Sequence, residues 1–205
     1  MSSPPALLYD TYYHIYNRGT NRENIFVQER NYEHFMRLYA KYIDPVADTF
    51  AYCLFRNHFH LLLRIKAKEE ILVDKETLKP SHLVPDYASR KFSNFFNAYA
   101  KAINVAYGRT GSLFQHPFGR VMVTSDRQFW NVIAYIHQNP QKHGFVKDFR
   151  DWKYSSYGLI LSEKATHVQS TCVMDRFGGR EQYLELHSQW VTEAQSKWFA
   201  EDDVD

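Results

Sequence analysis

The sequence predicts an α+β fold in which four strands and two helices follow one another in the order βαββαβ, with a further helix after them. Two observations indicate this order. Short runs rich in aromatic and β-branched residues alternate with longer runs whose apolar residues recur at helical spacing. Two of the short runs are separated only by Arg56 and Asn57, a spacing typical of a β-hairpin. The chain has 205 residues, of which 44% are hydrophobic, so it can bury a sizeable core.

The predicted elements have recognisable ends in the sequence. A turn-forming cluster, residues 18–21, follows the first strand, and Asp44-Pro45 ends the first helix. Gly108 closes a long amphipathic helix, and Pro140 is expected to end the last one. We therefore expect, in chain order, a strand at 12–17, a helix at 32–42, strands at 49–55 and 58–66, a helix at 85–107, a strand at 120–124 and a helix from 126 to 139.

This order of elements is the ferredoxin-like arrangement, an antiparallel sheet with two helices on one face. A helix that carries Tyr135 follows the sheet, and residues 181–198 predict a C-terminal helix. Residues 66–82 are polar and mixed in charge, so we expect an insertion loop there. The chain thus divides into a core domain, residues 1–158, and a C-terminal extension, residues 159–205, with an acidic end.

Charge is distributed unevenly along the chain, although the formal net charge is only +2. Between Arg56 and Arg127, twelve Lys and Arg residues stand against six Asp and Glu, so this stretch carries about +6 and the remainder about −4. Aromatic residues make up 17% of the chain. Basic charge among aromatic side chains is typical of a nucleic-acid partner, although an aromatic core with a solvated basic face would have the same composition.

Nothing in the sequence indicates export or membrane insertion. It has no run of about eighteen apolar residues, and its start lacks the basic and then apolar build of a signal peptide. We therefore expect a soluble, cytoplasmic protein without a membrane partner. The two cysteines, Cys53 and Cys172, lie far apart and neither belongs to a Cys-x-x-Cys pair, which excludes a cysteine-rich zinc site.

Two histidines on one predicted strand are the clearest indication of chemistry. Side chains alternate across a strand, so His58 and His60 share one face and the apolar residues between and after them share the other. If the helices cover the apolar face, both imidazoles point to the uncovered face, where they can bind one divalent metal ion. A His-x-His pair that is merely half-buried and hydrogen-bonded would show the same pattern. His14 could also lie on that face, although a lone strand histidine is more often structural. Packing or turn contacts are expected for His116, His137 and His143.

The end of the last core helix carries a second pair of polar residues. Tyr135 and Asn139 lie four residues apart and therefore on the same helical face. A phenolate is a competent nucleophile at phosphorus when a nearby cation lowers the pKa of the phenol, and an amide oxygen can complete a metal site built on two imidazoles. From the residues alone, Tyr135 could equally be a core tyrosine and Asn139 a helix terminator before Pro140.

Four segments together resemble the REP-associated tyrosine transposases, which form part of the single-tyrosine HUH transposase family. They are the His-hydrophobic-His strand, the helix end YIHQNP at 135–140, the stretch GSLFQHPF at 111–118 before Arg120, and the opening YHIYNRG at 13–19 with Ile25 and Phe26. These segments occur in the family's order and extend from about residue 12 to 157. The loop at 66–82 and the residues after 159 are not covered by the resemblance.

The resemblance implies a ferredoxin-like domain that binds single-stranded, often hairpin-forming DNA with a divalent metal, Mg²⁺ or Mn²⁺. It implies that Tyr135 is the nucleophile and that His58 and His60 are metal ligands. Asn139 stands at the position of the third ligand, where mobile relatives often have Gln, so its amide oxygen has a shorter reach. The implied reaction is a transesterification through a 5′-phosphotyrosine, which cleaves and rejoins strands without ATP. A homodimer is a weaker expectation from the same resemblance.

Six basic residues are candidates for contacts with DNA phosphates because they flank the strand ends or share the histidine face. They are Arg18, Arg22, Arg56, Arg64, Lys66 and Arg120. Arg64 and Lys66 continue the alternation of the two histidines, which predicts that they lie on the same uncovered face. Ordinary solvated rim charges would look the same in the sequence.

Three other functions remain open on the sequence. A domesticated relative would bind hairpins and cleave little. A small metal-dependent hydrolase would hold zinc with His58 and His60 and leave Tyr135 without a role. A ferredoxin-like RNA-binding module would use sheet aromatics such as Tyr16 and Tyr52 as stacking platforms.

Overall fold

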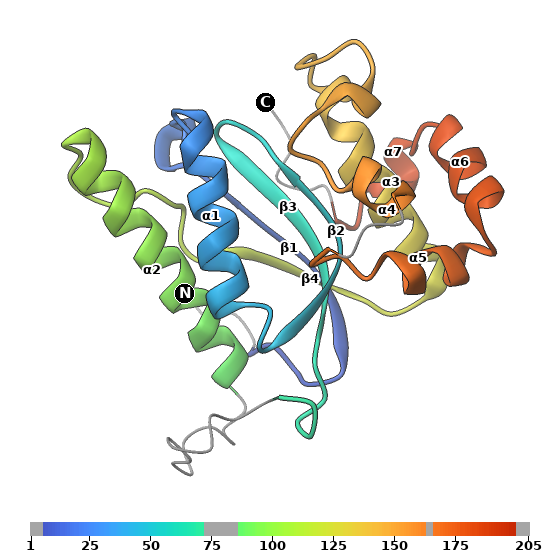
Figure 1. Cartoon of the computed structure of the whole chain (residues 1–205), viewed down its shortest axis with the longest axis horizontal. Helices are drawn as coiled ribbons and strands as arrows, with labels where there is room; N and C mark the ends of the chain where they lie inside the picture. Colours follow the sequence, from blue (N-terminus) through green and yellow to red (C-terminus); the bar gives the residue numbers. More distant parts are fainter. Residues whose placement is uncertain (1–5, 72–85, 163–165, 200–205) are drawn as a thin grey trace.

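A four-stranded antiparallel sheet forms the centre of the computed structural model, which describes residues 6–71, 86–162 and 166–199. Its strands are β1 (Thr11–Arg18), β2 (Ala47–Leu54), β3 (His58–Ile65) and β4 (Gly119–Val123). The strand order is β2-β3-β1-β4, so the central strands β3 and β1 pair with each other and with one outer strand each. This is the order of a ferredoxin-like sheet, and the predicted α+β fold class is confirmed (Figure 1).

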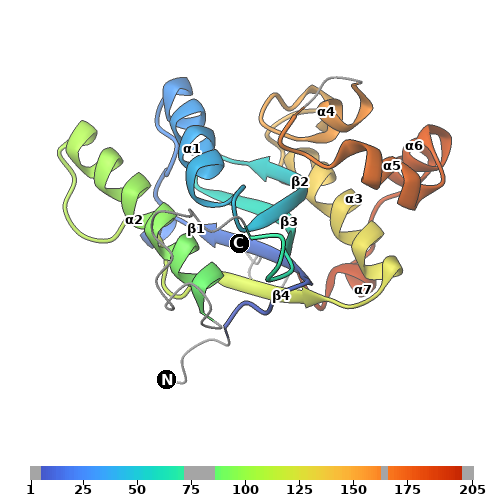
Figure 2. The ribbon, with the colours of Figure 1, turned by 60° about the horizontal axis from the view of Figure 1, so that its bottom comes forward.

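Two long helices, α1 (Glu29–Tyr42) and α2 (Tyr87–Tyr107), cover one face of the sheet (Figure 2). Aromatic side chains of both helices meet the sheet there, and the ring of Phe35 lies 5.2 Å from that of Phe59 and 4.8 Å from that of Phe95. The alternating apolar residues of β3 all belong to this core: Phe59, Leu61, Leu63 and Ile65. The predicted alternation along β3 is therefore confirmed on this face.

The opposite face of the sheet is also covered, so the prediction of an uncovered histidine face is wrong. α3 (Asp126–Lys142) packs against it, with contacts to β2 and β3. Beside α3 lie the short 3-10 helix Phe149–Asp151 and the helices α4 (Tyr157–Leu161), α5 (Ser170–Phe177), α6 (Arg180–Ser188) and α7 (Glu193–Ser196). Figure 1 shows this group on the side of the sheet away from α1 and α2.

α3 begins at Asp126, as predicted, but ends later than predicted. It starts after Ser125, whose side chain caps the helix by accepting a hydrogen bond from the backbone N–H of Gln128. It continues past Pro140 to Lys142, so the predicted end before this proline is wrong. Proline removes one backbone donor, but the following bond from the backbone N–H of His143 to the carbonyl of Asn139 keeps the last turn closed. Asn139 therefore lies inside the helix and does not terminate it.

Buried polar contacts fasten the C-terminal extension to α3. The rings of His137 and His187 are joined by a hydrogen bond of 2.9 Å. The amide group of Gln138 donates to the carbonyls of His187 and Gln189 and accepts from the backbone N–H of Val191. These contacts hold residues 189–192 in a non-helical conformation between α6 and α7, so the prediction of one continuous helix at 181–198 is wrong.

The remaining predictions concern the insertion, the acidic end, the cysteines and membrane-spanning helices. Of the predicted insertion at 66–82, residues 66–71 are described and residues 72–82 lie outside the described residues. The acidic residues Glu201, Asp202, Asp203 and Asp205 also lie outside them. Both cysteines are free thiols, with Cys53 buried and Cys172 exposed. In the described ranges, no helix combines the length and the apolar character that crossing a bilayer requires.

Gly19, at the end of β1, has no room for a side chain. An added Cβ would lie 2.0 Å from the backbone oxygen of Glu23 and 3.2 Å from a methyl carbon of Ile25. We expect Gly19→Ala to lower the free energy of unfolding by about 2–3 kcal/mol, because backbone atoms cannot move aside cheaply. Urea unfolding measures this change. Gly158→Ala is the control, since nothing lies within 4 Å of its added Cβ, and equal losses in both variants would contradict the expectation.

Candidate active site

His58 and His60 lie on the side of the sheet that faces α3. Their ring centroids are 5.3 Å apart and the rings are nearly perpendicular, at 86°. The two residues are only 5% and 3% exposed. On the neighbouring strand β1, Arg18 is opposite His58 and Tyr16 is opposite His60. The two central strands of the sheet therefore fix the positions of both imidazoles.

Both imidazoles are neutral in this environment. Burial, assisted by the charges of Arg18 and His143, lowers the pKa of His58 to about 3. Burial, followed by the imidazole of His14, lowers the pKa of His60 well below its usual value. A neutral imidazole keeps a lone pair on one nitrogen, which is the form that binds a metal ion.

Hydrogen bonds indicate which nitrogen of each ring is left for a metal. Nδ1 of His58 lies 2.7 Å from Oδ1 of Asn57, which can only accept, so Nδ1 donates and the lone pair is on Nε2. This Nε2 atom is buried and has no hydrogen-bond partner among the described residues. Nδ1 of His60 lies 3.0 Å from Nε2 of His14, so Nε2 is the nitrogen of His60 that can bind a metal.

One stripe of α3 faces the two imidazoles. The ring of Tyr135 stands edge-on to His60 with 5.7 Å between centroids, and the ring of His143 stands edge-on to His58 at 6.0 Å. Asn139 lies about one helical turn from Tyr135 and from His143, so it faces the gap between the imidazoles. It is fully buried, and neither polar atom of its side chain has a hydrogen-bond partner within the described chain.

These side chains fit a small site for a divalent metal ion. No group of three His, Cys, Asp or Glu residues in the described ranges is placed to hold a metal, so a site here requires another kind of ligand. The amide oxygen of Asn139 is such a ligand. Each buried polar atom without a partner costs about 1–3 kcal/mol, a cost that coordination would remove. Two imidazole nitrogens with one amide oxygen suit Mn²⁺ or Mg²⁺ with further oxygen ligands.

The hydroxyl of Tyr135 is buried beside the imidazoles. Tyr135 is 2% exposed, and its hydroxyl has no hydrogen-bond partner among the residues described. Phe199, which follows α7, packs on the ring of Tyr135 at 4.8 Å and also meets His14 at 5.8 Å. The structure thus brings the predicted nucleophile close to the histidine pair, but the last described residue covers it.

A cavity of about 230 Å³ opens beside the histidine pair. The ends of β1 and β3 and the segment before β4 form its wall, which consists of Tyr16, Asn17, Arg18, His58, Phe59, His60, Gln115, Pro117, Phe118 and Gly119. Gly119 leaves room for the ring of Tyr16, because an added Cβ would lie 2.1 Å from it. Tyr135 and Asn139 are not part of this wall. A substrate can therefore reach the imidazoles through the cavity, which Tyr135 does not line.

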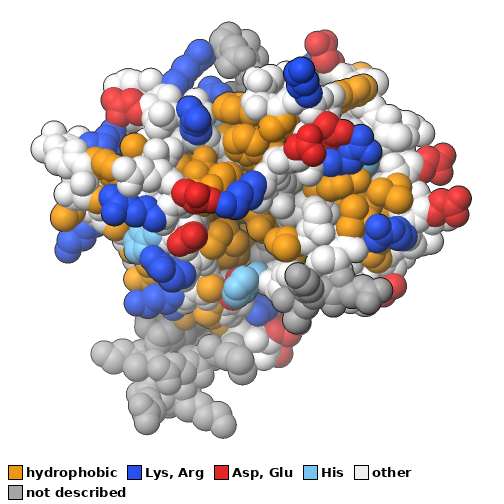
Figure 3. All heavy atoms as spheres, turned by 45° about the horizontal axis from the view of Figure 1, so that its top comes forward, with side chains coloured by type: hydrophobic (Ala, Val, Ile, Leu, Met, Phe, Trp, Pro, Cys, Tyr) orange, Lys and Arg blue, Asp and Glu red, His pale blue; other side chains and the backbone are white. Residues whose placement is uncertain are grey.

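Three of the six candidate basic residues lie near this cavity. Arg18 forms part of its wall. Arg22 and Arg56 are exposed on two neighbouring loops, which are joined by a 2.8 Å hydrogen bond from the backbone N–H of Ile25 to the carbonyl of Arg56. On the face seen in Figure 3, Lys and Arg side chains are interleaved with acidic and apolar ones.

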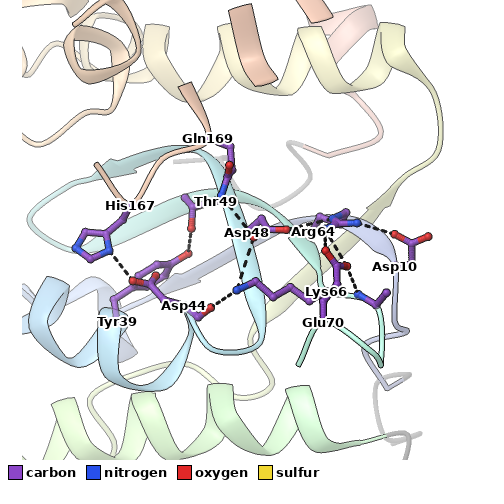
Figure 4. A network of polar contacts seen from close by, with 11 residues as sticks. Asp10, Tyr39, Asp44, Asp48, Thr49, Arg64, Lys66, Glu70, His167 and Gln169 are labelled. Carbon is purple, nitrogen blue, oxygen red and sulfur yellow. Dashed lines mark hydrogen bonds and ion pairs between the residues drawn. The ribbon is translucent and has the colours of Figure 1, made fainter. Parts of the chain in front are cut away.

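The other three candidates have different surroundings. Arg64 lies within 2.7–3.0 Å of three carboxylates: Asp10, Asp48 and Glu70 (Figure 4). Burial acts to lower the pKa of Arg64, but its hydrogen bonds to Asp48 and Glu70 raise this pKa overall. Lys66 donates to the carbonyl of Asp44 at 2.6 Å and lies 3.7 Å from a carboxylate oxygen of Asp48. Arg120 pairs with Ile15 and so points to the face that α1 and α2 cover, which contradicts a place on the histidine face.

The sequence interpretation missed two residues around the site and left the role of a third open. His14 was considered for the histidine face, where it lies, but its hydrogen bond to His60 was not foreseen. His143 was expected to serve packing, yet its ring stands beside His58. Phe199 carries no signal in the sequence, because its contact with Tyr135 joins residues 64 positions apart.

Comparisons with known proteins bear on this arrangement. No family model matches the sequence. A curated protein of Haemophilus influenzae, named as a REP-associated tyrosine transposase, is 27% identical over 110 residues, which are 54% of this chain and 58% of the relative. The chain thus spans little more than half the length of that relative.

A solved structure of a REP-associated tyrosine transposase bound to a REP hairpin superposes with a TM-score of 0.60 at 14% identity. The superposition covers 80% of this chain and 86% of the other, so the two share their fold. The resemblance to the REP-associated tyrosine transposases that the sequence motifs predict is therefore confirmed.

Proposed function

We propose that this protein is a DNA transposase that cleaves and rejoins single-stranded, hairpin-containing DNA through Tyr135. The observation that supports this most directly is the contact of Tyr135 from α3 with His60 of the histidine pair on β3, 5.7 Å between ring centroids. The name of the Haemophilus influenzae relative and the hairpin bound to the structural neighbour point to the same kind of substrate.

The chain would bind a divalent metal ion through Nε2 of His58, Nε2 of His60 and the amide oxygen of Asn139. When bound, Mg²⁺ or Mn²⁺ would polarise the scissile phosphodiester as a Lewis acid. The central strands hold both imidazoles and α3 holds the amide, so these three groups are positioned before substrate arrives. Arg18, Arg22 and Arg56 would contact phosphates near the cavity without reading bases.

Tyr135 would attack the phosphorus atom with its phenolic oxygen. A new bond forms between that oxygen and phosphorus while the bond from phosphorus to the 3′-oxygen breaks. The phenol loses its proton to water and the departing 3′-oxygen gains one, which leaves a 5′-phosphotyrosine and a free 3′-hydroxyl. Attack by another 3′-hydroxyl reverses the step onto a second strand, so rejoining needs no ATP.

Hairpin oligonucleotides with Mn²⁺ provide the test of this proposal. The wild type is expected to form a protein–DNA adduct that survives denaturation, and Tyr135→Phe is expected to form none, because it lacks the nucleophilic oxygen. Tyr99→Phe is a matched control, since Tyr99 is also buried but donates to the carbonyl of Ile25 in the other core. An adduct formed by Tyr135→Phe, or none formed by the wild type with a randomised hairpin library, would refute the proposal.

Attack by Tyr135 requires its buried hydroxyl to become accessible, and Phe199 packs on its ring at 4.8 Å. We therefore expect Phe199→Ala to raise the yield of adduct in the same assay. The increase is about tenfold for each 1.4 kcal/mol by which the substitution eases the opening. Trp190→Ala removes a ring that is 52% exposed and should leave the yield unchanged. A lower yield with Phe199→Ala would show that the ring supports the site.

The hydroxyl of Tyr135 is buried, and a buried nucleophile also favours a second candidate function, a hairpin-binding protein that cleaves little. Such a protein would bind hairpins and form no adduct even after Phe199→Ala. A metal-dependent hydrolase differs again, since Tyr135→Phe would keep most of its rate. The RNA-binding alternative lacks its platform, because helices cover both faces of the sheet (Figure 2).

A further inference from the structure

His14 and His60 form a pair of buried imidazoles across the two central strands. Their rings are stacked with 5.1 Å between centroids and 16° between planes, and Nε2 of His14 lies 3.0 Å from Nδ1 of His60. His14 is completely buried and His60 is 3% exposed. Water therefore cannot replace this hydrogen bond, and its direction has consequences for the metal site.

A hydrogen bond between two imidazole nitrogens needs one donor and one acceptor. If Nδ1 of His60 donates, the lone pair of His60 is on Nε2 and can bind a metal ion. If Nε2 of His14 donates instead, the hydrogen of His60 is on Nε2 and this residue cannot be a ligand. The direction of this hydrogen bond thus decides whether Nε2 of His60 can bind a metal ion.

Binding of a metal ion requires the first direction. A ligand imidazole gives the lone pair of Nε2 to the ion, so its hydrogen is on Nδ1. Nε2 of His14, 3.0 Å from Nδ1 of His60, is the atom placed to accept this hydrogen.

We propose that His14 is a positioning residue: by accepting the hydrogen of Nδ1, it fixes His60 in the tautomer whose Nε2 lone pair faces the metal site. This inference rests on the proposed function, because it assumes that His60 is a ligand. His14 itself is no ligand, since its Nε2 is occupied by the bond to His60. Partners of this kind orient a ligand ring, and their loss typically weakens metal binding by about 10–100-fold.

Nitrogen NMR of the full chain tests the first part of this inference. The protein is labelled with ¹⁵N-histidine and studied without metal or DNA at one neutral pH. Long-range ¹H–¹⁵N spectra are expected to show the hydrogen of His60 on Nδ1. In His14→Phe, which offers no acceptor, the hydrogen should distribute between the two nitrogens of His60. A wild-type His60 with its hydrogen on Nε2 would overturn the inference.

Titration with Mn²⁺, followed by electron paramagnetic resonance, tests the second part. His14→Phe is expected to bind Mn²⁺ about 10–100-fold more weakly than the wild type. His14→Gln keeps an amide oxygen at a similar reach and should restore most of the affinity. His187→Phe is the matched control, because it breaks the other buried His–His bond, of 2.9 Å to His137, away from the site.

The outcomes separate this inference from the proposed function. If the wild type binds Mn²⁺ and His14→Phe binds it equally well, the role of His14 is refuted and the proposed function stands. If the wild type binds no Mn²⁺, the proposed metal site and the inference fail together. If His14→Phe does not fold, as judged by circular dichroism, the wild-type tautomer and the Mn²⁺ affinity of His14→Gln decide the question. A folded His14→Gln that binds Mn²⁺ at least tenfold more weakly than the wild type would refute the role of the acceptor at position 14.

Discussion

Acidification is expected to unfold the protein between about pH 5.5 and 4.5. Burial lowers the pKa of each of five buried histidines, which are His14, His58, His60, His137 and His187. In the unfolded chain the same groups bind protons near a pKa of about 6.5. Between this value and the folded pKa, which is about 3 for His14 and about 4 for His187, the unfolded state binds more protons.

The sign of the effect follows from this difference. Stability is fully present above about pH 6.5 and falls as the pH drops, by about 1.4 kcal/mol per pH unit for each histidine. Five histidines together lose about 7 kcal/mol per unit, which is comparable to the total stability of many domains. Two units of acidification therefore suffice to unfold the chain.

Circular dichroism over a pH series measures the transition. Added Mn²⁺ should move the midpoint to lower pH, because the ion competes with protons at His58 and His60. His116→Asn is the control, since His116 is exposed and its loss should leave the midpoint unchanged. A protein that remains folded at pH 4 would show that the imidazoles are accessible to water.

Replacing Asn139 by leucine is expected to stabilise the fold and to weaken metal binding. Both polar atoms of Asn139 are buried without a hydrogen-bond partner among the described residues, so removing them should raise the free energy of unfolding by about 1–3 kcal/mol. The same change removes the proposed amide ligand, and the affinity for Mn²⁺ should fall by about tenfold or more. A higher free energy of unfolding together with a lower affinity for Mn²⁺ would indicate that Asn139 serves metal binding and does not stabilise the fold.

Gln138→Leu is the matched control for this prediction. Gln138 is the neighbouring buried amide on α3, but its side chain bonds to the backbone of three residues in the extension. Its loss should lower the free energy of unfolding and leave Mn²⁺ affinity unchanged. Urea unfolding and Mn²⁺ titration measure both quantities. If Asn139→Leu destabilises the chain as Gln138→Leu does, Asn139 has a structural role.

The local pattern of the sequence predicts the ferredoxin-like sheet and its helices well. Alternation along β3 places the apolar side chains under α1 and α2, and Gly108 ends α2 in a left-handed conformation with φ of 61°. Local patterns fail where distant contacts decide. The break between α6 and α7 depends on hydrogen bonds from Gln138, some fifty positions away, and the sequence around the break does not reveal them.

In the candidate site, too, local patterns predict some features and distant contacts determine the others. Spacing alone places His58 with His60, and Tyr135 with Asn139, on common faces, and the structure brings Tyr135 next to His60. The cover over these residues could not be predicted, because it depends on how α3 packs against β2 and β3 and on long-range contacts such as that of Phe199 with Tyr135. For Arg64, alternation predicts the correct side of β3 but not the three carboxylates that surround it.

The buried contacts between α3 and the extension determine how this chain can be shortened. A fragment that stops at the predicted boundary, residue 158, would leave the amide of Gln138 and the ring of His137 in water together with a row of apolar side chains. Val132 and Ile136 lie in one core with Val173 and Tyr183 of the removed part. We expect such a fragment to aggregate through the face of α3 that the extension covers, so a shortened version of the protein has to keep the extension.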